Sequence, residues 1–267
     1  MNVLRQIKYG LIKHGVLIER TVDSDSIHFF LKRFREHLVS VDLNRVGGDG
    51  DGGYLVPNIL DEITYCFSPG VNYTANFERE LSQSHNIKSY MADASVDSAP
   101  FDDPNFFFIK KFLGNRNDGE ILTLGSWVDS NVDDHDAKLL LQMDIEGAEY
   151  DVLTFEPIEF LKRFTCMIVE FHSVDEVFNK NFLRMFSSIF EKLYEHFSIC
   201  HVHPNNCCPV ASHDGIRIPS VFEVTFLRND YVEKLKNNNK IFLPHKLDQK
   251  NSKEYKDIEM PVEWWRC

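Results

Sequence analysis

An α/β fold built on a doubly wound, mostly parallel sheet is predicted by two features of the 267-residue sequence. From about residue 63, short apolar runs alternate with segments of helical periodicity, and this alternation is typical of parallel strands joined by right-handed crossovers. Several runs are apolar at every position, as strands are when helices cover both faces of the sheet. The seven predicted strands are residues 63–67, 88–92, 106–109, 139–143, 166–171, 197–202 and 221–227.

Helices are predicted between most of these strands, at residues 74–84, 149–164 and 174–196. No helix is predicted between the last two strands, so we expect them to pair as an antiparallel hairpin at one edge of the sheet. In a doubly wound fold, ligands bind at the carboxyl ends of the strands. The residues that follow each strand are therefore the first candidates for a functional site.

Two helices are predicted before the sheet, which divides the chain into a helical extension over residues 1–41 and a main domain over residues 42–267. Ser24 or Asp25 can cap the second helix, whose apolar residues recur at helical spacing: Ile27, Phe30, Leu31, Phe34 and Leu38. One face of the first helix carries Val3, Ile7, Leu11 and Leu17. This face favours packing against the protein's own core or a second subunit. A helix that binds a membrane surface or a partner is the alternative.

Composition and charge exclude several classes of protein. A hydrophobic content of 43% is ordinary for a folded domain. The formal net charge of -12 repels phosphate backbones, so we expect no nucleic-acid partner. Six cysteines without regular spacing indicate reduced thiols and a cytoplasmic protein. The sequence shows neither a secretory signal nor a run of about 20 apolar residues that could span a membrane.

The most distinctive motif follows the predicted strand 139–143. There Asp144 ends an apolar run and is followed by Glu146, Gly147 and the start of a helix. The sequence MDIEGAE at residues 143–149 resembles the signature of the FkbM-type methyltransferases, which transfer a methyl group from S-adenosylmethionine. Further segments resemble motifs found in branches of that family, namely RVGGDGDGGY at 45–54, VEFH at 169–172 and HVHPNN at 201–206.

The resemblance covers roughly residues 42–250 and implies a Rossmann-like class I methyltransferase fold. It also implies O-methyl transfer to a small or saccharide acceptor, and we favour a sugar hydroxyl of a surface glycan or its precursor. The methyl group could instead pass to a nitrogen, or to a lipid or polyketide hydroxyl. A further alternative is a methyltransferase fold that serves as a binding module, because the loop at 67–72 has a single glycine where the family has a glycine-rich loop.

A site for S-adenosylmethionine requires three kinds of contact. A turn after the first strand must hold the amino-acid part, and an acid after the second strand must accept hydrogen bonds from the ribose, for which we assign Asp93. A polar or stacking group must lie near the adenine. The other residues expected to contact the cofactor are Ser68, Pro69, Gly70, Asn72, Ser126, Trp127 and Asp144. The glycine-rich segment 45–54 is interpreted either as a hairpin turn or as a lid that adds Asp51, Gly52 and Tyr54.

Methyl transfer to a hydroxyl also requires alignment of the acceptor and removal of its proton. Asp144 and Glu170 end adjacent predicted strands, and His172 and His203 lie near the same rim, so we expect these four residues to be catalytic. Asp144, Glu170 and His172 could bind Mg²⁺ or Mn²⁺, or a histidine could act directly as the base. The residues expected to contact the acceptor are Glu146, His203, Asn205 and Asn206.

Other motifs are rejected on their context. Glycines within 48–53 match the G-x-G-x-x-G spacing, but we predict no strand before them and no helix after them. The same segment resembles half of a calcium loop, whose twelfth position would be Leu60 rather than the required Glu. Cys207 and Cys208 are adjacent and lack the spacing of zinc ligands.

Overall fold

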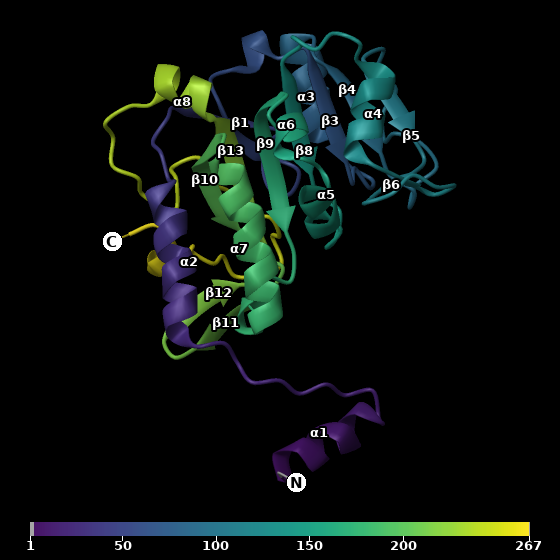
Figure 1. Ribbon diagram of the computed structural model, residues 1–267. Helices are drawn as coiled ribbons and strands as arrows, with labels where there is room; N and C mark the ends of the chain where they lie inside the picture. The colour runs from purple at the N-terminus through teal and green to yellow at the C-terminus, as the bar shows by residue number, and fades with distance from the viewer. Residues whose placement is uncertain (1–2, 267) are drawn as a thin grey trace.

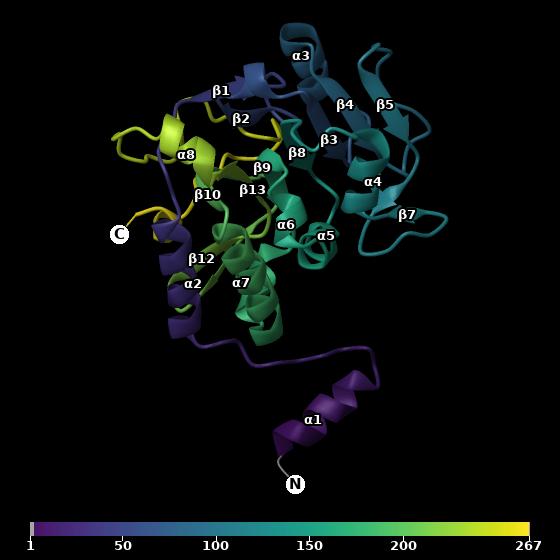
Figure 2. The same cartoon turned by 45° about the horizontal axis from the view of Figure 1, so that its top comes forward.

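The computed structural model describes residues 3–266. A seven-stranded sheet forms the centre, with helices on both of its faces (Figures 1 and 2). The helices are α1 (Val3–Ile12), α2 (Ser24–Glu36), α3 (Asn76–His85), α4 (Leu124–Asn131), α5 (Glu149–Phe155), α6 (Ile158–Leu161), α7 (Lys180–Tyr194) and α8 (Asn229–Leu235), with 3₁₀ turns η1 (Leu60–Glu62), η2 (Val174–Phe178) and η3 (Val262–Trp264).

The strands of the central sheet lie in the order β10-β13-β9-β8-β3-β4-β5. Their bounds are β3 (Tyr65–Pro69), β4 (Lys88–Ala92), β5 (Phe106–Ile109), β8 (Leu139–Met143), β9 (Phe164–Phe171), β10 (Phe197–Pro204) and β13 (Phe222–Arg228). Adjacent strands from β5 to β9 pair in parallel, and β13 runs antiparallel to both of its neighbours. This order confirms the predicted class I methyltransferase fold.

The final pair of predicted strands differs in one detail from the expected edge hairpin. β10 and β13 do pair in antiparallel fashion, but β13 lies between β9 and β10, which leaves β10 at the edge. A small hairpin, β11 (Val210–His213) and β12 (Ile216–Pro219), connects the two strands. The first six residues of β13 are buried, and an apolar strand of this kind is more stable with neighbours on both sides than at an edge.

Three predicted helices have different limits in the structure. Pro157 divides the predicted helix 149–164 into α5 and α6, and its last residue already belongs to β9. The segment 174–196 begins as a 3₁₀ turn, and Asn179 then caps α7 by accepting hydrogen bonds from two backbone amides. The cap of α2 is Asp23, whose side chain accepts a bond from Ser26 N, rather than Ser24 or Asp25.

Aromatic side chains join α2 and α7 to the sheet. Phe30 packs edge-on against Phe190 of α7 at a ring distance of 5.5 Å. Trp264 is fully buried and lies 5.1 Å from Phe34 and 4.9 Å from Phe222. Helix α2 and the segment around Trp264 therefore share the hydrophobic core of the main domain.

Helix α1 lies apart from the rest of the molecule, at the end of an extended connection (Figures 1 and 2). The connection reaches the domain where Glu19 Oε2 accepts a hydrogen bond of 2.8 Å from Asn179 Nδ2 and Val22 N donates one to Phe178 O. Ile7 and Leu17 are 52% and 63% exposed, so this face does not pack against the protein's own core, which was one of the two partners that we favoured for it. Among the described residues, no helix has the length and apolar character needed to cross a bilayer.

The remaining small strands flank the ligand edge of the sheet. β1 (Leu43–Val46) and β2 (Tyr54–Pro57) form an antiparallel hairpin, and β6 (Phe112–Leu113) pairs in parallel with β7 (Ile121–Leu122). The strand order reverses direction between β3 and β8. In doubly wound folds such a switch point opens a crevice beyond the carboxyl ends of the two strands.

Candidate functional site

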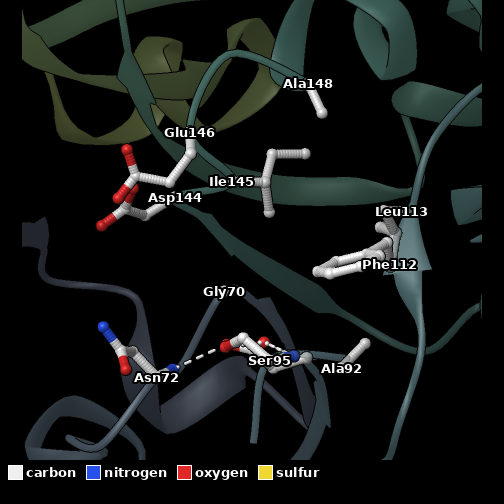
Figure 3. Close-up of a pocket in the computed structure, with 11 residues that line it drawn as sticks. Gly70, Asn72, Ala92, Ser95, Phe112, Leu113, Asp144, Ile145, Glu146 and Ala148 are labelled. Atoms are coloured by element: carbon white, nitrogen blue, oxygen red, sulfur yellow. Dashed lines mark hydrogen bonds between the residues drawn. The ribbon is translucent and has the colours of Figure 1, made fainter.

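A cavity of about 230 Å³ lies at this switch point (Figure 3). Its walls come from β4, β6 and the loops that follow β3, β4 and β8. The lining residues are Gly70, Asn72, Ala92, Asp93, Ser95, Phe112, Leu113, Asp144, Ile145, Glu146 and Ala148. A second cavity of about 110 Å³ shares Gly70, Asn72, Asp144 and Glu146 with it. The two cavities therefore meet along the end of β8.

Gly70 brings the loop after β3 against the end of β8. Its φ is +88°, and a Cβ at this position would lie 1.6 Å from the backbone oxygen of Asp144. Only glycine fits such a conformation and contact. Gly70 N donates to Ala92 O, and Asp144 N donates to Pro69 O. The carbonyl of Pro69 thus links the ends of β3 and β8. The single glycine of this loop lets the backbone at residue 70 lie close to the backbone of Asp144.

Asp93 is 7% exposed and lies directly after β4. Its Oδ2 accepts a bond of 2.8 Å from Asn72 N, and its Oδ1 accepts bonds from the backbone N and the hydroxyl of Ser95 at 2.8 and 2.6 Å. These bonds fix the carboxylate at the cavity wall. A carboxylate offers about four acceptor positions, so Asp93 can accept a further hydrogen bond from a ligand.

Phe112 is an aromatic wall residue that sequence reasoning missed. Its ring projects into the cavity between Ile145 and Ser95 (Figure 3), and the residue is 50% exposed. The signal in the sequence is an aromatic residue just beyond the apolar run 106–109, where a parallel strand ends at the ligand edge. Phe112 and Ile145 offer apolar surfaces against which a flat ring can stack.

The residues predicted near the adenine lie elsewhere. Trp127 is 3% exposed and packs edge-on against Phe67 at 5.0 Å in the hydrophobic core. Ser126 is hydrogen-bonded to Thr123 and Asn117. Neither Trp127 nor Ser126 is among the described residues that line the two cavities.

Ser68 lies beneath the second cavity. It is fully buried, and its hydroxyl contacts the carboxylate of Glu78 and, at 2.5 Å, Oε1 of Gln142. Gln142 in turn donates to the hydroxyl of Tyr54 at 3.0 Å. Burial raises the pKa of the Glu78 carboxyl above its usual range. This polar network supports the floor of the cavity from the β3 and β8 strands.

The glycine-rich segment forms the turn of the β1–β2 hairpin. A short strand does precede it, contrary to our expectation, but β2 rather than a helix follows, so the dinucleotide interpretation remains excluded. Arg45 donates to the carbonyls of Gly48 and Gly50 and shapes the turn. Asp51, Gly52 and Tyr54 line the second cavity, so the hairpin also forms part of the wall of the site, as a lid would.

Asp144, Glu146 and His172 converge at the rim. His172 Nε2 lies 3.6 Å from Asp144 Oδ1 and 3.6 Å from Glu146 Oε2. One ligand atom from each of the three residues lies within 4.8 Å of the others. Glu146 adopts a φ of +56°, which is unusual for a residue other than glycine and turns the chain sharply after β8. Burial, and to a lesser extent the charges of Glu146, Asp51 and Glu223, raise the pKa of Asp144 to about 7, against the lowering effect of His172.

Glu149 holds His172 in a defined orientation. Its carboxylate is fully buried; Oε1 accepts a bond of 2.7 Å from His172 N and lies 3.2 Å from His172 Nδ1, while Oε2 accepts a bond from Gly147 N. A proton on Nδ1 facing Glu149 leaves the lone pair of Nε2 directed at Asp144 and Glu146. Burial lowers the pKa of His172, but the bond to Glu149 and the nearby acids outweigh this effect and raise it.

Glu170 lies below this rim, at the end of β9. It is 3% exposed, its Oε1 accepts a bond of 2.7 Å from Asn205 Nδ2, and it faces Glu223 across the β9–β13 pair. Burial, followed by the charges of Asp144 and Glu223, raises its pKa well above the ordinary value. Within residues 3–266, its Oε2 has no hydrogen-bond partner. Glu146, rather than Glu170, therefore completes the group of possible metal ligands.

The HPNN residues hold the C-terminal segment of the chain. His203 is 6% exposed and lies 3.6 Å from Asp248, whose pKa is lowered by His201 and His203 despite its burial. Asn206 exchanges hydrogen bonds with the backbone of Ser252. His203, Asn205 and Asn206 are absent from the described lining of both cavities. Their observed contacts are with the protein itself.

Comparison with protein families agrees with this fold. Residues 70–196 match the family model described as the methyltransferase FkbM domain. A search of curated proteins found no matching sequence. Similar solved structures include a SAM-dependent methyltransferase from Archaeoglobus fulgidus, with 11% identity over 77% of this chain and 94% of that chain and a TM-score of 0.36. Spermidine synthase from Thermotoga maritima is 11% identical over 79% and 82% of the two chains, with a TM-score of 0.37.

The strand order, with an antiparallel seventh strand between the fifth and sixth, gives the fold directly. The family match begins at Gly70 and includes the MDIEGAE segment and the VEFH segment. Residues 70–196 of this chain thus form an FkbM-type methyltransferase domain.

Proposed function

We propose that this protein is an S-adenosylmethionine-dependent O-methyltransferase that acts on a hydroxyl group of a saccharide, such as a surface glycan or its precursor. The observation that carries the proposal is the cavity at the switch point, where the fixed carboxylate of Asp93 and the exposed ring of Phe112 face the same space. The reduced cysteines support a cytoplasmic location.

The residues of the first cavity fit the three parts of the cofactor. Gly70 and Asn72 form the turn for the amino-acid part, Asp93 can accept hydrogen bonds from the ribose hydroxyls, and Phe112 can stack on the adenine. The bound cofactor would supply an electrophilic methyl group on a sulfonium. The carboxylates of Asp144 and Glu146 at the junction of the two cavities complement such a positive charge.

The second cavity suits a hydroxylated acceptor. Its wall includes the polar side chains of Asp51, Thr74, Asn76 and Gln142 beside Asp144. Hydroxyl groups of a sugar can exchange hydrogen bonds with such groups, whereas a lipid or polyketide chain would leave them without partners. This lining favours a saccharide over the alternative acceptors.

Proton removal is assigned to the rim residues. His172 Nε2, oriented by Glu149, can accept the proton of the acceptor hydroxyl, and Asp144 can stabilise the resulting imidazolium. Alternatively, Asp144, Glu146 and His172 would hold Mg²⁺ or Mn²⁺, and Glu149 would orient the histidine ligand through its Nδ1. Removal of metal with a chelator, followed by addition of Mn²⁺ or Mg²⁺, separates the two: loss and recovery of turnover assign a metal, and unchanged turnover assigns the histidine.

Calorimetry of the full chain with S-adenosylmethionine tests the proposal. We expect micromolar binding, which Asp93→Asn weakens, with Asp97→Asn as the matched control because Asp97 is exposed and pairs with Lys110. Absence of binding at millimolar cofactor would instead support a binding module. Mass spectrometry of nucleotide sugars and glycans after incubation with labelled cofactor would then identify the acceptor.

A further inference from the structure

We propose that the segment from α1 to Arg20 is a peripheral anchor that binds the surface of an anionic lipid bilayer. Helix α1 projects from the domain in both overall views (Figures 1 and 2). The connection that follows it first contacts the domain at its end, where Glu19 and Thr21 lie beside Asn179, the N-cap of α7. The inference does not depend on the proposed methyl transfer, because it rests on exposed side chains and charge outside the site.

Large apolar side chains of this segment face solvent. Ile7, Ile12, Leu17 and Ile18 are 44–63% exposed, and Tyr9 is 52% exposed. A helix of ten residues is marginal in water without tertiary packing. A contiguous exposed apolar surface also favours an interaction with a partner or a membrane. Something in solution is therefore expected to cover this segment.

The net charge of residues 5–20 favours an anionic bilayer as the surface that covers this segment. Residues 5–20 carry four basic side chains against one acid, Glu19, a formal net charge of +3 in a chain whose total is -12. Basic side chains beside exposed apolar ones are typical of helices that lie in the headgroup region of anionic membranes. The remainder of the chain is strongly acidic and would be repelled by such a surface, so the extended connection keeps the domain away from the headgroups while α1 binds.

A second copy of α1 is a poorer fit. Two such segments would bring net charges of +3 together, and the like charges oppose pairing through the apolar face. An anionic bilayer supplies both the apolar layer for Ile7 and Leu17 and the negative charge for Lys13 and Arg20. A neutral bilayer supplies only the first.

Co-sedimentation of the full chain with vesicles tests the inference. We expect binding to phosphatidylcholine vesicles that contain about 30% phosphatidylglycerol, at least about tenfold stronger than to pure phosphatidylcholine, and weaker at high salt. Ile7→Asp with Leu17→Asp should abolish binding. Lys13→Glu with Arg20→Glu should weaken it at least about tenfold.

Matched control variants make the same kinds of substitution at exposed positions outside the segment from α1 to Arg20. Phe242→Asp replaces another exposed apolar residue, and Lys240→Glu with Lys253→Glu makes the same charge change among exposed residues. Both should leave vesicle binding unchanged. Equal binding to neutral and anionic vesicles, no binding to either, or equal loss in the controls would overturn the inference. A dimer in light scattering that Ile7→Asp with Leu17→Asp converts to a monomer, without vesicle binding, would assign a second copy as the occupant and also overturn it.

Discussion

The two halves of the ligand edge are built in opposite ways. At the ends of β3 and β4, the carboxylate of Asp93 receives three hydrogen bonds from the chain around it. At the ends of β8 and β9, Asp144 is half-buried and Glu170 is buried, and the pKa of each is raised. In the described part of the chain, each of these two acids has one oxygen without a hydrogen-bond partner.

In the first half the chain itself satisfies the acid, whereas in the second half each acid keeps an oxygen that no other described residue bonds. A satisfied carboxylate is a rigid, preorganised acceptor that costs the fold little. A buried acid without full compensation destabilises the fold, and such residues are retained at functional sites. We therefore expect substitutions in the first half to weaken cofactor binding and substitutions in the second half to change turnover, stability and pH dependence.

The largest expected effect is on turnover in Asp144→Asn. The amide keeps the shape of the side chain but removes the charge that faces His172 Nε2 at 3.6 Å, so kcat should fall by about 10²–10⁴-fold. Steady-state assays with the identified acceptor would measure this, alongside Asp151→Asn as an exposed acid on α5. A variant with full turnover would show that the second half is not the reacting centre.

The same substitution should stabilise the fold at high pH. Burial raises the pKa of Asp144 to about 7 in the folded protein, against about 4 in the unfolded chain. Between pH 4 and pH 7 the carboxyl is therefore ionised in the unfolded chain but still protonated in the folded protein, so the free energy of unfolding falls as the pH rises. Asp144→Asn removes that loss and should gain about 2–4 kcal/mol in free energy of unfolding at pH 8, with little gain near pH 4.

Denaturant unfolding over this pH range measures the gain. Asp151→Asn, at an exposed position, should change stability by less than about 0.5 kcal/mol at every pH. A gain in Asp144→Asn that is independent of pH would argue against an uncompensated acid at this position.

A smaller effect is expected in the first half of the edge. Asp93→Asn should raise the dissociation constant of S-adenosylmethionine by about 10–100-fold, since a charged hydrogen bond to the ribose is worth about 1.5–3 kcal/mol. Calorimetry gives this constant, and kcat at saturating cofactor should change little. If kcat fell while affinity held, the two halves would have exchanged roles.

The smallest effect should follow Glu149→Gln. Gln keeps an oxygen that can accept from His172 N, but the charge facing His172 Nδ1 is lost. We expect about a tenfold loss of turnover. Because Glu149 contributes to the raised pKa of His172, the acid limb of the profile of kcat/KM against pH should move to lower pH. An unchanged profile would exclude His172 as the group that titrates there.

Strand positions were predictable because both faces of a parallel sheet are buried. The runs at 88–92, 106–109 and 139–143 have the limits of β4, β5 and β8, since continuous apolar runs leave little freedom in where a strand lies. The helix limits were less certain, because Pro157 and Asn179 act locally within longer helical patterns. The position of β13 between β9 and β10 depended on long-range pairing and had no local signal.

The candidate site was partly predictable for the same reason. Gly70, Asn72, Asp93 and Asp144 line the cavity because each follows a parallel strand, and all parallel strands end at one edge. Phe112 and Glu149 were missed, since the first belongs to a two-residue strand and the second is an ordinary helix residue until His172 is brought beside it.

The parallel sheet, the family resemblance and the edge expected to bind a ligand could be predicted without coordinates, because burial periodicity and strand-end motifs are local properties of the chain. Which acids face the cavity depends on how the chain folds. Glu146 reaches the rim through a positive φ, whereas Glu170 turns beneath it toward Asn205. That choice depends on the direction of each side chain and on a partner from a distant segment, neither of which spacing along the chain encodes.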